Sequence, residues 1–153
     1  MKNSDAVASA FLNQSIEYLV NHYQPKIESC VAQLSDEQIW WRPNSSSNSI
    51  GNLILHVCGN ARQWIVSGLG DERDHRVRDL EFSQTEIIPR EELVKLLDDT
   101  LTDVRTVLEN LPTESLLQSR KIQGRDVLVL EAVFHVTEHF SMHTGQIILL
   151  TKR

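Results

Sequence analysis

The sequence predicts an all-α fold, a bundle of four helices in a single domain that spans residues 1–153. Three observations lead to this prediction. Four long stretches carry apolar residues at alternating intervals of three and four, which is the period of an amphipathic helix. No stretch alternates convincingly between apolar and polar residues, as a half-buried strand would. Proline, glycine and serine fall between the four stretches, so these segments read as separate helices that pack together.

The first helix is expected over residues 5–34, with a kink or break near residues 21–24 because Pro25 removes one hydrogen bond. Ser35 can cap a short turn with Gln38 in the reciprocal position. Trp40 and Trp41 follow, and we expect them to close one end of the bundle, with ligand stacking as the alternative.

Ser49 is a suitable N-cap for the second helix, expected over residues 49–66 and ended by Gly68 and Gly70. Residues 70–88 alternate in charge and show no period, which indicates a solvated connection that acts as a lid or a crossover. The third helix is expected over residues 89–111. A turn around Gly124 follows, and Asp126 is expected to cap a fourth helix that reaches residue 151.

Composition limits the classes of function. With 153 residues, 41% hydrophobic and 24% charged, the chain is typical of a globular domain of ordinary size. The net charge of −6 and the lack of a Lys/Arg run argue against nucleic acid as a partner. No apolar run approaches the ~18 residues that a membrane span needs. Residues 1–10 are polar, so we expect a cytoplasmic protein, and the 2 cysteines are too few for a disulfide scaffold.

The fourth helix carries three histidines at intervals of four: His135, His139 and His143. Side chains at this spacing share one helix face, and here the row overlaps the apolar stripe. His56 lies at the edge of the buried stripe of the second helix, with Asn60 one turn further on. In a bundle, such inward side chains can meet on facing helices and bind a metal ion. The alternative is that each imidazole is a core residue with its own hydrogen-bond partner.

Three neutral imidazoles suit Zn²⁺, Ni²⁺ or Fe²⁺ and leave a coordination position open for water or substrate. Spacing alone does not decide which histidines of the fourth helix bind, and His135 could be a fourth ligand or a supporting residue. Asn60 and His135 are candidate catalytic residues, Asn60 for orienting substrate or water. For Asn60, a structural hydrogen bond between helices is an equally good interpretation.

The segments NLILHVCGNARQW (residues 52–64) and EHFSMHTGQI (residues 138–147) resemble those of the DinB-like family, and the tract Trp41-Arg42-Pro43 resembles an uncharacterised branch of it. The resemblance runs from about residue 10 to the end. It implies an up-down-down-up four-helix bundle, frequent homodimers and one divalent metal held by His56, His139 and His143. His135 then stands where relatives often keep a histidine that need not touch the metal.

The resemblance says less about the reaction. Better-understood members use low-molecular-weight thiols such as bacillithiol or mycothiol, so a thiol S-transferase with a small-molecule substrate is the first expectation. Zinc is the metal expected first. A metal-dependent hydrolase on the same site is the second hypothesis, and a non-enzymatic metal-binding stress-response dimer is the third.

Overall fold

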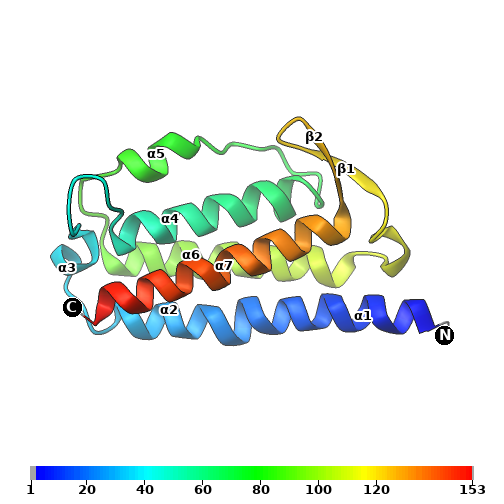
Figure 1. The fold of residues 1–153 in the computed structure, drawn as a ribbon, viewed down its shortest axis with the longest axis horizontal. Helices are drawn as coiled ribbons and strands as arrows, with labels where there is room; N and C mark the ends of the chain where they lie inside the picture. Colours follow the sequence, from blue (N-terminus) through cyan, green and yellow to red (C-terminus); the bar gives the residue numbers. More distant parts are fainter. Residues whose placement is uncertain (1–2, 153) are drawn as a thin grey trace.

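The computed structural model describes residues 3–152, and the predicted domain's residues 1–2 and 153 lie outside this part of the chain. Four long helical rods form a bundle, as the sequence predicts (Figure 1). The first rod consists of α1 (Asn3–Ile16), the π-helical segment η1 (Glu17–Tyr23) and α2 (Gln24–Val31). The second consists of α4 (Ile50–Ala61) and the π-helical segment η2 (Arg62–Ser67). The third is α6 (Arg90–Asn110), and the fourth is α7 (Val129–Thr151).

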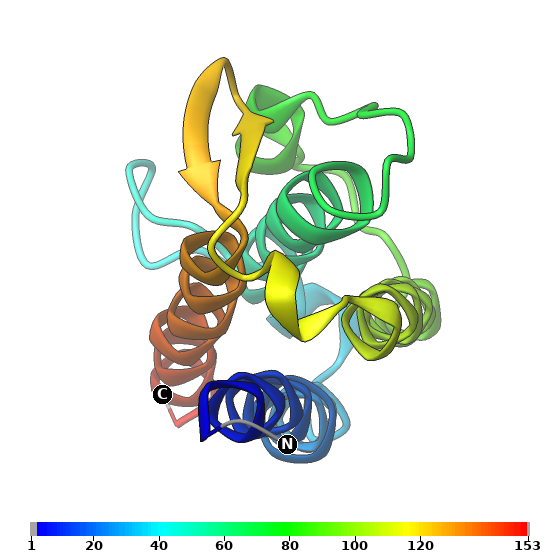
Figure 2. The same cartoon turned by 90° about the vertical axis from the view of Figure 1, so that its right-hand side faces the viewer.

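The chain runs along the bundle in the order up, down, down, up, because α4 and α6 point the same way and opposite to the outer two rods (Figure 1). Viewed along the bundle, the four rods occupy the corners of a square (Figure 2). α4 packs against α6 and α7, and the first rod packs against the same two helices. Their apolar faces meet along the axis, where the largest fully buried side chains include Leu19, Ile27, Ile54, Leu97, Leu101 and Phe140.

Because α4 and α6 are parallel, the connection between them must return along the whole length of the bundle. It crosses the outer side of α4 as an extended segment followed by the short helix α5 (Arg78–Ser83), which packs on α4 (Figure 1). This connection places charged residues next to α4. The sequence-based prediction of a fully solvated connection was therefore wrong for part of it.

Two predicted helix starts are confirmed, and both rest on capping. Ser35 begins α3 (Asp36–Trp40) with a capping box that includes Gln38, and Ser49 begins α4 with a capping box that includes Asn52. Near Pro25 the first rod does not break. It takes the π-helical form of η1 instead, and Pro25 falls in the first turn of α2, where its missing N–H is tolerated.

A small hairpin was not predicted. β1 (Ser119–Ile122) and β2 (Arg125–Leu128) pair antiparallel, and the 3-10 turn η3 (Thr113–Ser115) precedes them. Gln123 and Gly124 both have positive φ, 52° and 73°, which is the two-residue turn that suits a tight hairpin. Asp126 lies within β2, so it does not cap α7. That helix begins at Val129, where the Leu128 N–H donates to the Glu131 carboxylate.

Among the described residues, no helix combines the length and the apolar character that crossing a lipid bilayer requires.

Candidate metal centre

The packing of α4 against α7 brings His56, His139 and His143 together. One ring nitrogen from each lies within 4.8 Å of the others. The Nε2 atoms of His56 and His139 are 2.9 Å apart, and the ring centroids of His56 and His143 are 4.9 Å apart. His56 stands on the inner face of α4, and the other two occupy successive turns of α7. The three candidate ligands named from the sequence therefore share one site.

The remaining ring contacts indicate which nitrogen of each histidine faces the centre. The Nδ1 of His56 lies 2.8 Å from the Glu81 Oε2, and a carboxylate can only accept, so Nδ1 carries the hydrogen. The Arg76 Nη2, 3.2 Å from the same Nδ1, donates to the closer Glu81 Oε2 instead. The Nδ1 of His143 donates in the same way to Gln146 Oε1 at 2.7 Å. Both Nε2 atoms then carry a lone pair, and that of His56 faces the Nε2 of His139 at 2.9 Å. The Nε2 of His143 is buried and has no hydrogen-bond partner among the described residues.

These residues fit a divalent metal ion. Two ligands on a tetrahedral Zn²⁺ with Zn–N bonds of about 2.0–2.1 Å are about 3.3 Å apart, so only small side-chain shifts would be needed. A buried, unpaired acceptor costs free energy, and a metal ion would satisfy it. Metal-binding histidines commonly donate their other ring N–H to a carboxylate or carbonyl, as His56 and His143 do.

The environment of His139 and His143 favours the neutral form that metal binding needs. Burial and the neighbouring imidazoles lower the pKa of His139 from 6.5 to about 3. Burial also lowers the pKa of His143, although its hydrogen bond to Gln146 opposes this effect. Little competition from protons is therefore expected at neutral pH.

Two residues of the site were missed by the sequence reasoning. Glu81, on α5, is buried and bonded to His56, and Arg76 donates to both of its carboxylate oxygens at 2.7 and 3.0 Å. Burial would raise the pKa of Glu81, but the hydrogen bonds from His56 and Arg76 outweigh it and hold that pKa below its ordinary value. The alternating charges of residues 70–88 gave no sign that one pair is buried.

The two candidate catalytic residues contact each other beside the three histidines. The Asn60 Nδ2 lies 3.2 Å from the His135 Nε2, and the His135 ring stacks on His139 with centroids 5.4 Å apart. The other face of His135 meets Trp64, at 4.1 Å between centroids. The Nε2 of His135 therefore contacts Asn60, and His135 lies one turn of α7 before His139, outside the group of three.

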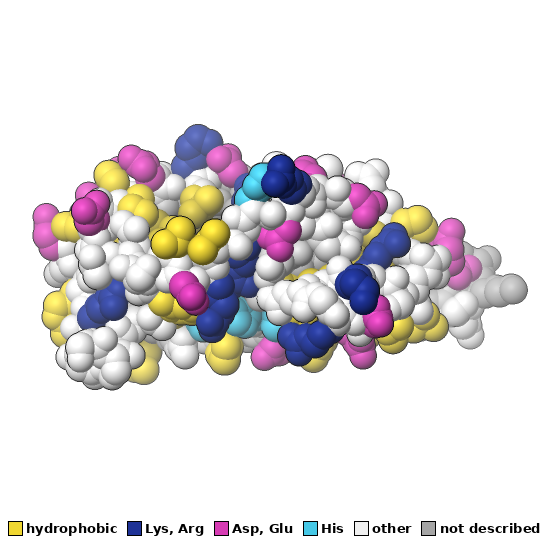
Figure 3. Space-filling view, turned by 90° about the horizontal axis from the view of Figure 1, so that it is seen from above, with side chains coloured by type: hydrophobic (Ala, Val, Ile, Leu, Met, Phe, Trp, Pro, Cys, Tyr) yellow, Lys and Arg dark blue, Asp and Glu magenta, His cyan; other side chains and the backbone are white. Residues whose placement is uncertain are grey.

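The other candidate polar groups lie away from the centre. Cys58 is buried, and burial raises the pKa of its thiol to about 12, so it stays a neutral, buried thiol. His22 is exposed and contacts Lys26, and His75 is exposed in the connection. Seen from above, histidine side chains reach the surface at two places beside Lys or Arg side chains (Figure 3). His135 and His139 are only partly buried, so the site has an edge open to small molecules.

Comparisons of structure define the class of protein. The fold is similar to that of a conserved protein from Enterococcus faecalis, with a TM-score of 0.74 and 15% identity over 92% of this chain and 94% of that chain. It is also similar to a DinB-like protein from Bacillus cereus, with a TM-score of 0.68 and 18% identity over 92% and 89% of the two chains. A DinB-like protein from Bacillus subtilis gives 0.68 and 18% over 91% and 90%. The chain therefore has the DinB-like bundle fold.

The sequence places the chain within this class. It belongs to the DUF1572 family, described as proteins of unknown function, whose pattern matches residues 6–153. No curated protein matches the chain. The chain is thus a member of the DUF1572 family with the DinB-like bundle fold, and its group of three histidines could hold a metal ion.

Proposed function

We propose that this protein is a metal-dependent enzyme that binds one divalent ion, zinc first and nickel or iron as alternatives, through His56, His139 and His143. The observation that carries the proposal is the buried, unpartnered Nε2 of His143, whose ring packs against those of His56 and His139. Three protein ligands leave a position open on a tetrahedral ion, which is typical of catalytic rather than structural zinc.

The reaction we propose is S-transfer from a low-molecular-weight thiol to a small electrophilic substrate, as the family resemblance implies. A free thiol has a pKa near 8.5, and a divalent metal in the site would supply deprotonation of the bound thiol at neutral pH. The partly exposed edge at His135 and His139 gives such a molecule access. Asn60 and His135 lie beside the open edge, where they would contact and orient the substrate.

The surroundings of the three histidines favour S-transfer over the hydrolase hypothesis. A metal-dependent hydrolase commonly uses a carboxylate as general base on the attacking water. Among the described residues, Glu81 is the carboxylate hydrogen-bonded to a member of the group, His56, and His56 and Arg76 occupy its two oxygens. A thiol that is deprotonated on binding needs no such base.

We also propose that the protein is a homodimer, as the resemblance implies. In support, an apolar hollow of about 650 Å³ lies between α1, η3 and the start of α7, lined by the exposed Val7 and Leu117 with Phe11, Leu116 and Leu130 among others. Sedimentation velocity at two protein concentrations tests this part of the proposal.

The first experiment is metal analysis of purified, untagged wild type and His143→Ala, with His75→Gln as a matched control at an exposed histidine. We expect about one ion per chain in wild type and in the control, and none in His143→Ala. No metal in wild type after addition of zinc or nickel would overturn the proposal. If metal is bound, thiol-dependent loss of monobromobimane tests S-transfer, and metal-dependent stability without turnover would favour the non-enzymatic hypothesis.

A further inference from the structure

The connection between α4 and α6 contributes directly to the histidine centre. We call residues 71–83, which include α5, the strap. Its Glu81 is only 8% exposed and bonds to His56, although α5 itself is short and its other residues are mostly exposed. Burying a carboxylate is costly unless the charge is paired and hydrogen-bonded. The strap meets this condition with its own Arg76, whose Nε and Nη2 engage the two carboxylate oxygens.

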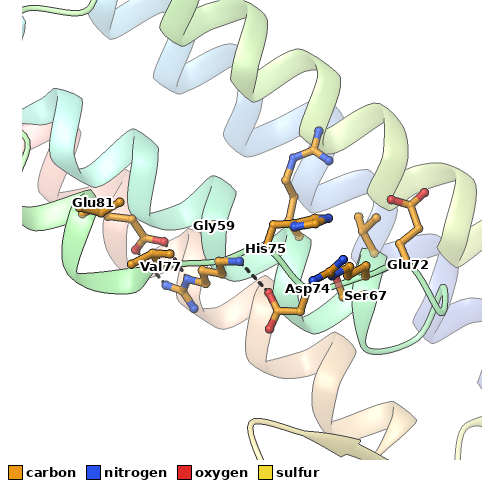
Figure 4. Close-up of a pocket in the computed structure, with 12 residues that line it drawn as sticks. Gly59, Ser67, Glu72, Asp74, His75, Val77 and Glu81 are labelled. Carbon is orange, nitrogen blue, oxygen red and sulfur yellow. Dashed lines mark hydrogen bonds and ion pairs between the residues drawn. The ribbon is translucent and has the colours of Figure 1, made fainter.

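α4 has a gap shaped for this carboxylate. Gly59 lies one turn after His56, and a Cβ atom built on it would fall 2.0 Å from the Glu81 Oε1. Any other residue at this position would push the carboxylate away from α4. Gly59, Val77 and Glu81 stand together at one end of a hollow of about 340 Å³ under the strap, with Ser67 and Glu72 at the other end (Figure 4).

Side chains hold the extended part of the strap in place. Gln63, on η2, accepts from the Arg76 Nη1 at 3.0 Å and donates to Asp74 at 2.7 Å. The hairpin residue Gln123 also donates to Gln63. The position of Arg76, and with it that of Glu81, is therefore set by contacts to α4's own extension, η2.

We infer that Glu81 is a positioning residue for the metal centre and that, through Glu81, metal binding is coupled to closure of the strap. This inference rests on the metal binding of the proposed function. An ion on the Nε2 of His56 requires the hydrogen on Nδ1, where Glu81 accepts it. Because coupling is reciprocal, a closed strap favours metal binding, and bound metal favours the closed strap.

The first test is calorimetric titration of metal-stripped, full-length protein with Zn²⁺. Glu81→Gln keeps the shape of the side chain and removes its charge, and Glu86→Gln makes the same change at an exposed position of the same connection. We expect affinity to fall about 10- to 100-fold in Glu81→Gln, the range for lost supporting partners of metal ligands. Glu86→Gln should bind as wild type does. Wild-type affinity in Glu81→Gln would overturn the inference.

A second variant leaves Glu81 and all three histidines in place. Gly59→Ala favours the helix yet displaces the carboxylate, so it should weaken Zn²⁺ binding by a comparable factor without preventing folding. The double variant Gly59→Ala/Glu81→Gln should bind no more weakly than the weaker single variant, because both changes break one interaction. Losses of Zn²⁺ affinity that add up in the double variant would show that the two changes act through different interactions.

Limited trypsin digestion measures the strap itself, because Arg73 and Arg78 are exposed cleavage sites within it. Zn²⁺ should slow cleavage there several-fold in wild type and in Glu86→Gln, and leave the rate in Glu81→Gln unchanged. If wild type binds no Zn²⁺, the proposed function fails as well. If wild type binds Zn²⁺ and the ion protects Glu81→Gln equally, only the coupling is wrong.

Discussion

Burial favours the neutral form of the three histidines of α7 that line its contact with α4. Burial lowers the pKa of His135, His139 and His143, and the mutual repulsion of charged rings adds to this for His139. An unfolded chain lacks both effects, so its histidines titrate near 6.5. Protonation of these histidines therefore favours the unfolded chain over the folded one.

We predict that the metal-free protein loses stability as the pH falls from 7 to 5. The pKa of His139 is about 3 in the folded state, so between 6.5 and 3 the unfolded chain binds a proton that the folded chain does not. The free energy of unfolding, measured with urea, should therefore decrease with falling pH. His139→Gln should flatten this dependence and His75→Gln should not. An equal slope in all three proteins would contradict the prediction.

One contact distinguishes His135 from His139 and His143. It shares the helix face of His139 and His143, but its Nε2 faces Asn60 at 3.2 Å. We predict that His135→Gln retains about one ion per chain, in contrast to His143→Ala. Elemental analysis after dialysis tests this, and loss of the metal in His135→Gln would make His135 a ligand.

Among the helices and strands, the ones predicted correctly have either a clear period of apolar residues or a capping residue. The four long rods followed from an apolar period repeated over several turns. The caps at Ser35 and Ser49 followed from short local motifs. The hairpin did not, because strands of four residues carry almost no period, although the turn at Gly124 was recognised. Glu81 and Arg76 were missed because their burial depends on contacts with α4, 20 to 25 residues earlier, which no local pattern in the connection reveals.

Two glycines give a prediction about helix packing. A Cβ on Gly51 would fall 2.6 Å from the Trp40 ring, whereas a Cβ on Gly145, on the exposed side of α7, would have nothing within 4 Å. Gly51→Ala should lower the free energy of unfolding by about 1–3 kcal/mol. Gly145→Ala should raise it by about 0.5–1 kcal/mol, because alanine favours the helix. Urea unfolding of both variants measures the difference, and equal effects would show that Trp40 yields freely.

On the scale of the whole molecule, the centre joins two rods that are far apart in the chain, since His56 and His139 are separated by 83 residues. An ion held by both would tie α4 to α7 in the folded state only. Ligands that bind the folded state alone stabilise it by an amount that grows with their concentration.

We predict that Zn²⁺ raises the melting temperature of the metal-stripped protein. At a concentration about 1,000 times its Kd, the ion should add about 4 kcal/mol, or roughly 10 °C for a chain of this size. A chelator should reverse the shift, and His139→Ala should show little of it. Differential scanning calorimetry provides the measurement. An equal shift in His139→Ala would mean that the ion binds elsewhere.

Because α4 and α6 are parallel, the connection between them can vary in length and sequence. A connection that must travel back along the bundle is long by necessity, and its outer residues can gain or lose length without disturbing the packed rods. In this protein that same connection supplies one wall of the histidine centre. Insertions in the strap would therefore change the surroundings of an unchanged set of three imidazoles, so a single bundle could acquire new substrates through changes in this one segment.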